Sequence, residues 1–165
     1  MPRSFAAQRP PLTQVESRPR RDREINAAPG GFMGDVSPAQ TWQALQSQPE
    51  AVLVDVRTHA EWAFVGSPDL VSLGKPVIQV EWQTFPSMER NPRFVKELQA
   101  QGVTPEQLIY IICRSGVRSR DAAEWLAKLG YTTFNVAEGF EGPIDSNGHR
   151  GASGWRAEQL PWRQS

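Results

Sequence analysis

The residues best suited to chemistry surround Cys113, the one cysteine of the chain. It is followed by Arg114, Ser115, Gly116, Val117, Arg118 and Ser119. A single cysteine leaves no partner for an intramolecular disulfide and no set of thiolates for a structural zinc site. Arginines and a glycine directly after a cysteine argue against burial, and positive charge favours the thiolate, which is the nucleophilic form. The sequence therefore predicts a reactive, accessible thiol at this position.

The segments on either side of Cys113 indicate where the thiol lies in a fold. Residues 108–112, LIYII, form an unbroken apolar run, which is typical of a strand buried on both faces of a parallel sheet. Residues 119–130 have the apolar spacing of a helix that ends at Gly130. We therefore expect Cys113 between a strand end and a helix start, where backbone N–H groups and the helix dipole stabilise an anion.

The loop composition adds to this expectation. Ser115 and Gly116 let the backbone curl around the sulfur as an anion-binding nest. Arg114, Arg118 and Arg120 bring positive charge within eight residues of the thiol, opposed in that stretch by Asp121 alone.

The rest of the chain alternates between strand and helix patterns. Ser37 and Pro38 predict a helix start. Further expected elements are strands at 51–56 and 77–82, a short helix at 59–64 and a helix that begins near Asn91 and ends at Gly102. This order predicts an α/β fold with a mostly parallel central sheet and helices on both faces. Ligands in such folds bind beyond the carboxyl ends of the strands.

Asp55 and Arg57 follow the first of these strands. We expect them to form a hydrogen-bonded pair that braces the sheet end near the site. Trp82, Phe85 and Phe140 lie on connections that could form pocket walls. His59 and His149 are isolated histidines without metal-ligand spacing around them, so neither a metal site nor a cofactor is predicted.

Composition divides the chain at about residue 33. Residues 1–33 are rich in Pro, Arg, Gln and Gly without periodicity, which predicts a disordered arm, or a segment upstream of a true start at Met33. They hold six of the 18 basic and three of the 18 acidic residues, so residues 34–165, the predicted domain, are mildly acidic. No nucleic-acid partner is therefore expected. Without a secretory signal or membrane-spanning run, a cytoplasmic location is expected.

Three segments together resemble the rhodanese-like sulfurtransferases. The segment from Cys113 to Ser119 resembles the active-site loop of that family. Asp55-Val56-Arg57 with Glu61-Trp62 and Gly66 resembles the first family signature, and NVAEGFEGPID…GWRAEQLPW resembles the C-terminal signature, in which residues 138–142 face the cysteine. The likeness covers residues 36–162. The chain departs from the family pattern at 65–70 and in the extension SNGHRGASG, which affects substrate choice more than fold.

This resemblance implies a covalent sulfur transfer. The Cys113 thiolate would take the outer sulfur of a donor such as thiosulfate, carry it as a persulfide and pass it to cyanide, a thiol or a protein acceptor. Loop N–H groups would hold the persulfide, while Arg114 and Arg118 would orient the donor.

The cysteine loop is compatible with two functions besides catalytic sulfur transfer. Phosphatases and arsenate reductases with a related loop need five residues between cysteine and arginine, whereas four separate Cys113 from Arg118, and Ser119 stands at the position of the phosphatase arginine. This spacing favours sulfur transfer. The third possibility is an interaction module or a sulfur carrier that docks on one protein; the intact cysteine argues against an inactive module, and the carrier stays open.

Overall fold

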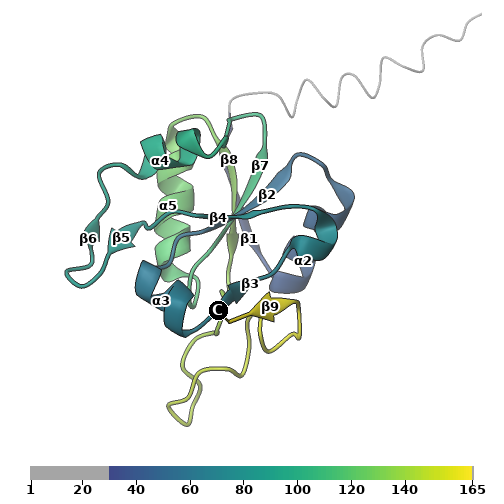
Figure 1. Ribbon diagram of the computed structural model, residues 1–165, viewed down its shortest axis with the longest axis vertical. Coiled ribbons are helices and arrows are strands. Elements are labelled where there is room, and N and C mark those ends of the chain that lie inside the picture. Colours follow the sequence, from purple (N-terminus) through teal and green to yellow (C-terminus); the bar gives the residue numbers. More distant parts are fainter. Residues whose placement is uncertain (1–29, 165) are drawn as a thin grey trace, which may run out of the picture.

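Five parallel strands form the central sheet of the computed structural model, which describes residues 30–164 (Figure 1). They are β1 (Phe32–Val36), β2 (Ala51–Asp55), β4 (Val77–Gln79), β7 (Leu108–Ile112) and β8 (Thr132–Val136). The spatial order is β1-β8-β7-β2-β4, so β7 lies in the middle. A central strand is covered on both faces, which explains why its sequence is apolar at every position. The predicted parallel sheet is confirmed.

Helices pack on both faces of this sheet. The helices of the described region are α2 (Pro38–Ser47), α3 (His59–Phe64), α4 (Phe94–Ala100) and α5 (Val117–Lys128), with a 3-10 turn at Val71–Leu73. Helices α4 and α5 lie on one side of the sheet and α2 on the other (Figure 1). Within residues 30–164, no helix has the length and apolar character needed to cross a bilayer.

The side chains of β7 alternate between two hydrophobic cores. Ile109 and Ile111 pack with Phe94 of α4 and Leu126 of α5, and Cys113 belongs to the same core. Tyr110 and Ile112 face the other core, which contains residues of α2 and the tryptophan at position 155. The two-residue period of a strand therefore directs Cys113 toward the α5 side.

Two short antiparallel pairs complete the structure. β3 (Ser67–Pro68) pairs with β9 (Trp162–Arg163), and β5 (Gln83–Thr84) pairs with β6 (Glu89–Arg90). The β3–β9 pair brings the backbone carbonyl of Arg163 and the side chain of Trp162 against Gly66. These pairs lie in segments that the sequence indicates as turns and connections, because two-residue strands have no measurable period.

Helix starts follow the sequence closely. Ser37 caps α2: its hydroxyl accepts from Gln40 N at 3.0 Å, and its own N–H donates to Gln40 Oε1 at 2.8 Å. Helix α3 has the predicted bounds. Helix α4 begins later than expected, at Phe94, because the Asn91 side chain accepts from Arg93 N and holds a turn before the helix.

The main difference concerns the beginning of the folded region. Residues 1–29 of the expected arm lie outside the described residues. Phe32 and Met33, also assigned to the arm, belong to β1, which pairs with β8 at the edge of the sheet. A half-buried edge strand that contains a glycine gives little hydrophobic pattern, so it is hard to identify from sequence.

Candidate active site

Cys113 lies at the carboxyl end of β7, directly before the turn into α5, as predicted. It is 1% exposed, so the expectation of an accessible thiol is wrong. The chain curls over the sulfur: Gly116 N–H donates to Sγ at 3.1 Å, and Ser119 Oγ lies 3.1 Å from Sγ. The expected curl of the backbone around the sulfur is present at Gly116, and it contributes to burying the thiol.

Gly116 adopts a conformation that other residues rarely take. Its φ angle is 103°, and a Cβ at this position would overlap the carbonyl of Ala137. Its own carbonyl accepts from Arg120 N at 3.3 Å, within the first turn of α5. Because both the dihedral angle and the space exclude a side chain, glycine is needed for the N–H to point at the sulfur.

Ser119 connects the thiol to a polar side chain that the sequence did not reveal. Its hydroxyl donates to Asn135 Oδ1 at 2.5 Å. Asn135 Nδ2 donates to Asp35 Oδ1 at 3.0 Å and to Gly116 O at 3.1 Å, so the orientation of the amide is fixed. A serine hydroxyl has one proton, and it is used here. Therefore the Cys113 S–H donates to Ser119 Oγ when the thiol is protonated.

Glu61 is the second residue whose role was missed. Its carboxylate binds Arg118 through two hydrogen bonds, at 2.8 and 2.9 Å, and its Oε1 also accepts from Thr58 N at the start of α3. Burial raises the pKa of Glu61, but the hydrogen bonds and charge of Arg118 and the bonds from Thr58 outweigh it and lower that pKa to about 2. Burial lowers the pKa of Arg118, but Glu61 raises it above its ordinary value, with smaller contributions from Cys113 and Asp55.

The three arginines of the loop and of the start of α5 differ in their surroundings. Arg118 is tied to Glu61, and the two side chains are 16% and 18% exposed. Arg120 pairs with Asp35 and Glu124 on the surface. The side chain of Arg114 is exposed and makes no ion pair within residues 30–164. Arg114 is therefore the loop cation available to an incoming anion.

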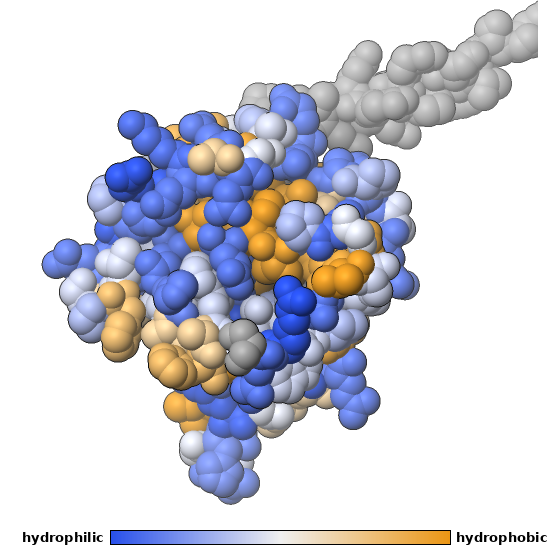
Figure 2. Space-filling model, in the orientation of Figure 1, coloured by the Kyte–Doolittle hydropathy of each residue, from blue (hydrophilic) through white to orange (hydrophobic). Residues whose placement is uncertain are grey.

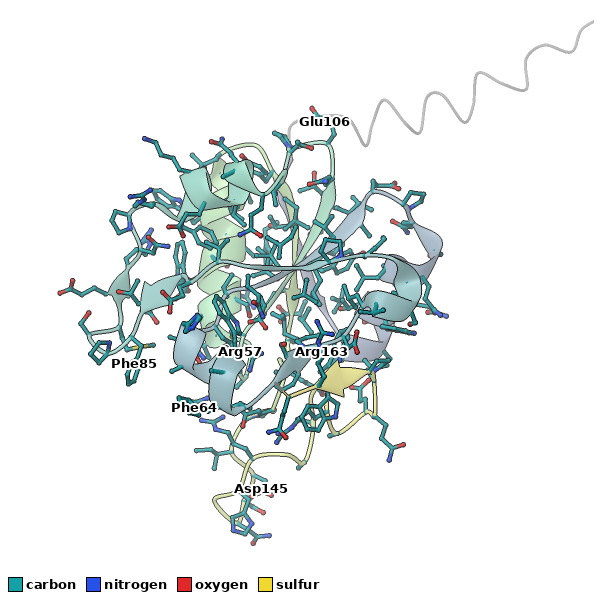
Figure 3. All side chains as sticks on the ribbon, viewed as in Figure 1. Arg57, Phe64, Phe85, Glu106, Asp145 and Arg163 are labelled. Carbon is teal, nitrogen blue, oxygen red and sulfur yellow. The ribbon has the colours of Figure 1, made fainter. Side chains whose placement is uncertain are left out.

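The predicted pair of Asp55 and Arg57 is present and fully buried. Arg57 Nε donates to Asp55 Oδ1 at 3.0 Å, and Nη2 donates to Oδ2 at 2.8 Å. Nη2 also donates to Gly66 O at 2.7 Å, and the guanidinium lies 4.3 Å from the ring centroid of Phe140. Figure 3 labels Arg57 in the interior, close to the loops below the sheet. The pair fixes the turn after β2 to the turn after α3.

Residues 138–142 pack against the cysteine loop, where the C-terminal signature suggested they would lie. Phe140 N donates to Cys113 O at 2.8 Å, and Glu141 N donates to Arg114 O at 2.9 Å. Gly139 permits this contact, because a Cβ there would lie 2.5 Å from the carbonyl of Arg114. These bonds hold residues 138–142 against the backbone of Cys113 and Arg114.

An open pocket lies beside the loop, with a volume of about 320 Å³. It is lined by Thr58, Ala60, Glu61, Val65, Phe85, Met88, Arg114 and Arg118. Phe85 thus lines the pocket as suspected, while Trp82 and Phe140 are buried and do not. Ser115 is half-buried, and Val117, which is 68% exposed, begins α5. Among residues 30–164, no group of three His, Cys, Asp or Glu side chains could hold a metal ion.

Comparisons with known proteins agree with this architecture. A family model described as the STR4 middle domain matches residues 33–165. An uncharacterized protein of Rickettsia conorii is 33% identical over 130 residues, which cover 78% of this chain and 96% of that protein. Rhodanese-like domain-containing protein 4 of Arabidopsis thaliana, a chloroplast protein, is 30% identical over 140 residues; these cover 84% of this chain and 27% of the plant protein.

Solved structures give the same result. The crystal structure of Rv0390 from M. tuberculosis superposes with a TM-score of 0.75 at 49% identity, covering 82% of this chain and 100% of that one. The polysulfide-sulfur transferase of Wolinella succinogenes shares the fold, with a TM-score of 0.53 at 20% identity and coverage of 92% and 91%. By its matching family model, its relatives and its fold, the chain belongs to the rhodanese-like domain proteins.

Proposed function

We propose that the protein is a sulfurtransferase that moves a sulfane sulfur through a persulfide on Cys113. The observation that carries this proposal is the position of the sulfur. Sγ lies at the carboxyl end of β7 and at the start of α5, where the backbone N–H of Gly116 donates to it at 3.1 Å. A backbone N–H fixed in this way, together with the start of α5, stabilises an anion on sulfur before and after transfer.

The first half-reaction loads the sulfur. The Cys113 proton leaves to solvent, and the thiolate attacks the outer sulfur of thiosulfate. A new S–S bond forms on Sγ, the S–S bond of the donor breaks, and its electron pair leaves with sulfite. Arg114, the exposed loop cation, attracts the dianionic donor, while Arg118 holds the loop against α3 through Glu61.

The second half-reaction unloads the sulfur. Cyanide, a low-molecular-weight thiol or the cysteine of a protein acceptor attacks the outer sulfur of the persulfide. With cyanide, a C–S bond forms, the S–S bond breaks, and its electron pair returns to Cys113 as thiolate, with thiocyanate as product. No cofactor is required, because the cysteine alone carries the sulfur between the two substrates.

The phosphatase alternative has weaker support. That chemistry needs a guanidinium at position 119 to bind a tetrahedral oxyanion. Ser119 is instead fully buried and bonded to Asn135 and the thiol. Four residues also separate Cys113 from Arg118, whose guanidinium is held by Glu61. The loop is therefore better suited to a sulfur atom than to a phosphate group.

The test uses intact-mass spectrometry of the reduced protein with and without thiosulfate. We expect a gain of one sulfur atom, reversed by cyanide with release of one equivalent of thiocyanate. The variant Cys113→Ser should gain nothing. A wild-type protein that takes no sulfur from thiosulfate or from a persulfide donor would contradict the proposal, and Cys113-dependent hydrolysis of p-nitrophenyl phosphate would favour the phosphatase.

A further inference from the structure

A second cleft, with a volume of about 560 Å³, lies against another face of α3. His59, Trp62 and Ala63 line it, and their spacing of three and four residues places them on one side of the helix. Ala60 and Glu61, which line the pocket beside the cysteine loop, project from other sides of α3. The two cavities are therefore separate, and the sulfur-transfer function proposed above does not use the second one.

The remaining walls of the cleft come from three strand segments. Gln79 of β4, at the edge of the sheet, forms one wall, and Ser67 of β3 with Arg163 and Gln164 of the β9 segment forms another. Gln164 Nε2 donates to Val65 O at 3.3 Å, which connects the β9 segment to the end of α3. Apolar side chains gather over β4, and hydrophilic side chains lie over β9 below it (Figure 2). The cleft thus lies between an apolar and a hydrophilic part of this face.

The indole of Trp62 carries a hydrogen-bond donor that is not used within the protein. Its Nε1 is buried and has no acceptor among the residues that the structure describes. A buried indole N–H normally has a partner, because leaving it without one is unfavourable. The His59 imidazole meets the indole nearly at a right angle, with 5.9 Å between the ring centroids. An acceptor atom of a ligand in the cleft would satisfy the indole N–H.

The charge of the lining indicates the kind of acceptor. Arg163 is exposed and forms no ion pair within residues 30–164. The lining contains no carboxylate from the described part of the chain. A phosphate monoester carries a charge of about −1.5 to −2 at neutral pH, which exceeds that of one guanidinium, whereas a carboxylate carries a single negative charge. One cation, one indole N–H and an aromatic wall therefore match a carboxylate attached to a flat ring.

We propose that this cleft binds aromatic carboxylates. The carboxylate accepts from the Arg163 guanidinium and from the Trp62 N–H, and the indole turns toward the cleft to present that N–H. The ring of the ligand packs against the His59 imidazole and Ala63. The volume of about 560 Å³ lies within the range of about 300–1,000 Å³ that is usual for small-molecule sites, so it accommodates a ligand of two fused rings.

The direct test adds 2-naphthoate to ¹⁵N-labelled protein and follows the indole N–H resonances by NMR. The chain has six tryptophans, and the resonance that is absent from Trp62→Phe identifies Trp62. We expect this resonance to move downfield and to saturate as 2-naphthoate is added. The uncharged 2-naphthamide, which has the same shape, should bind at least about fivefold more weakly. A Trp62 resonance that does not move up to the solubility limit of 2-naphthoate would overturn the proposal.

Calorimetry with variants separates this cleft from the pocket beside the cysteine loop. Arg163→Gln should weaken 2-naphthoate binding about fivefold or more, and Trp62→Phe, which keeps an aromatic ring and loses the N–H, about threefold or more. Arg163 is exposed, so its replacement should leave the fold intact. The matched control Arg114→Gln removes the exposed arginine of the other pocket and should change the affinity by less than about twofold. Weaker binding in Arg114→Gln with unchanged binding in Arg163→Gln would place the ligand in the other pocket, and the proposal would be wrong.

Discussion

The hydroxyl of Ser119 donates its one proton to Asn135 Oδ1 over 2.5 Å. It therefore accepts from the Cys113 thiol in the resting state, and it must turn to donate when the sulfur becomes an anion. That change leaves Asn135 Oδ1 without a donor. The position of one proton in this pair is thus linked to the charge of the sulfur.

We predict that Ser119→Ala slows sulfur loading about tenfold or more, because a hydrogen bond to a charged group contributes about 1.5–3 kcal/mol. The same change leaves Asn135 Oδ1 buried without a partner and should lower the free energy of unfolding by roughly 1–3 kcal/mol. Stopped-flow loading and urea denaturation measure the two effects. Ser119→Thr, which keeps the hydroxyl, should restore most of the rate; a Thr variant as slow as the Ala variant would contradict a role for the hydroxyl.

Gly116→Ala should destabilise the fold strongly and abolish sulfur loading. The new Cβ meets the carbonyl of Ala137, and the φ angle of 103° is unfavourable for alanine. The matched control is Gly74→Ala: Gly74 has a φ angle of 69° with open space around it, so that change should cost about 1 kcal/mol and leave activity intact. Thermal denaturation and intact-mass loading test both variants, and equal losses of stability would argue against the steric explanation.

The ion pair of Glu61 and Arg118 should make stability depend on pH in acid. The folded-state pKa of Glu61 is about 2, below its ordinary value of 4.5. Between these values the unfolded state binds more protons, so stability is complete above about pH 4.5 and falls as pH decreases toward 2. We predict that Glu61→Gln removes this part of the acid dependence and lowers stability at pH 7 by roughly 1.5–3 kcal/mol.

The control for this experiment is Glu124→Gln, which removes an exposed pair with Arg120. It should change stability by less than about 0.5 kcal/mol and leave the acid profile as in the wild type. Urea titrations from pH 2 to 7 measure the profiles. A Glu61→Gln profile that coincides with that of the wild type would show that the pair carries no pH-dependent stability.

The two arginines of the loop should give different kinetic results. Arg114→Ala should raise the KM for thiosulfate several-fold, and added salt should reduce the difference from the wild type, because an exposed charge acts through screened attraction. Arg118→Ala leaves Glu61 partly buried without its partner, so it should lower the free energy of unfolding as well as activity. Arg120→Ala serves as control for loss of charge alone. A larger KM effect in Arg118→Ala than in Arg114→Ala, without loss of stability, would restore Arg118 as the residue that orients the donor.

Much of this fold can be predicted because the decisive signals are local. The apolar run of β7, the Ser37 cap and the short distance between Asp55 and Arg57 are each contained in a few residues. The resemblance of the cysteine loop to one family then gives the site. Local patterns do not show which distant side chain forms a hydrogen bond or an ion pair with a given residue.

The missed features depend on contacts that are distant in sequence. Glu61 is 57 residues from Arg118, and Asn135 is 16 residues from Ser119. Burial of Cys113 depends on the loop closing over its own sulfur and on residues 138–142 packing against the backbone of Cys113 and Arg114. A single asparagine in the short strand β8 is compatible with a surface position, so its burial becomes apparent only with the neighbouring elements in place.

The pairing of β3 with β9 has a consequence for how the protein is made. The carbonyl of Gly66 accepts from the buried Arg57, and the residue is covered by the carbonyl of Arg163 and the side chain of Trp162. During synthesis the ribosome must add almost a hundred residues after Gly66 before this cover exists. Contacts between such distant segments form late in folding. We therefore expect the turn after α3, which Arg57 holds through Gly66, to stay uncovered in the nascent chain until β9 has emerged from the ribosome.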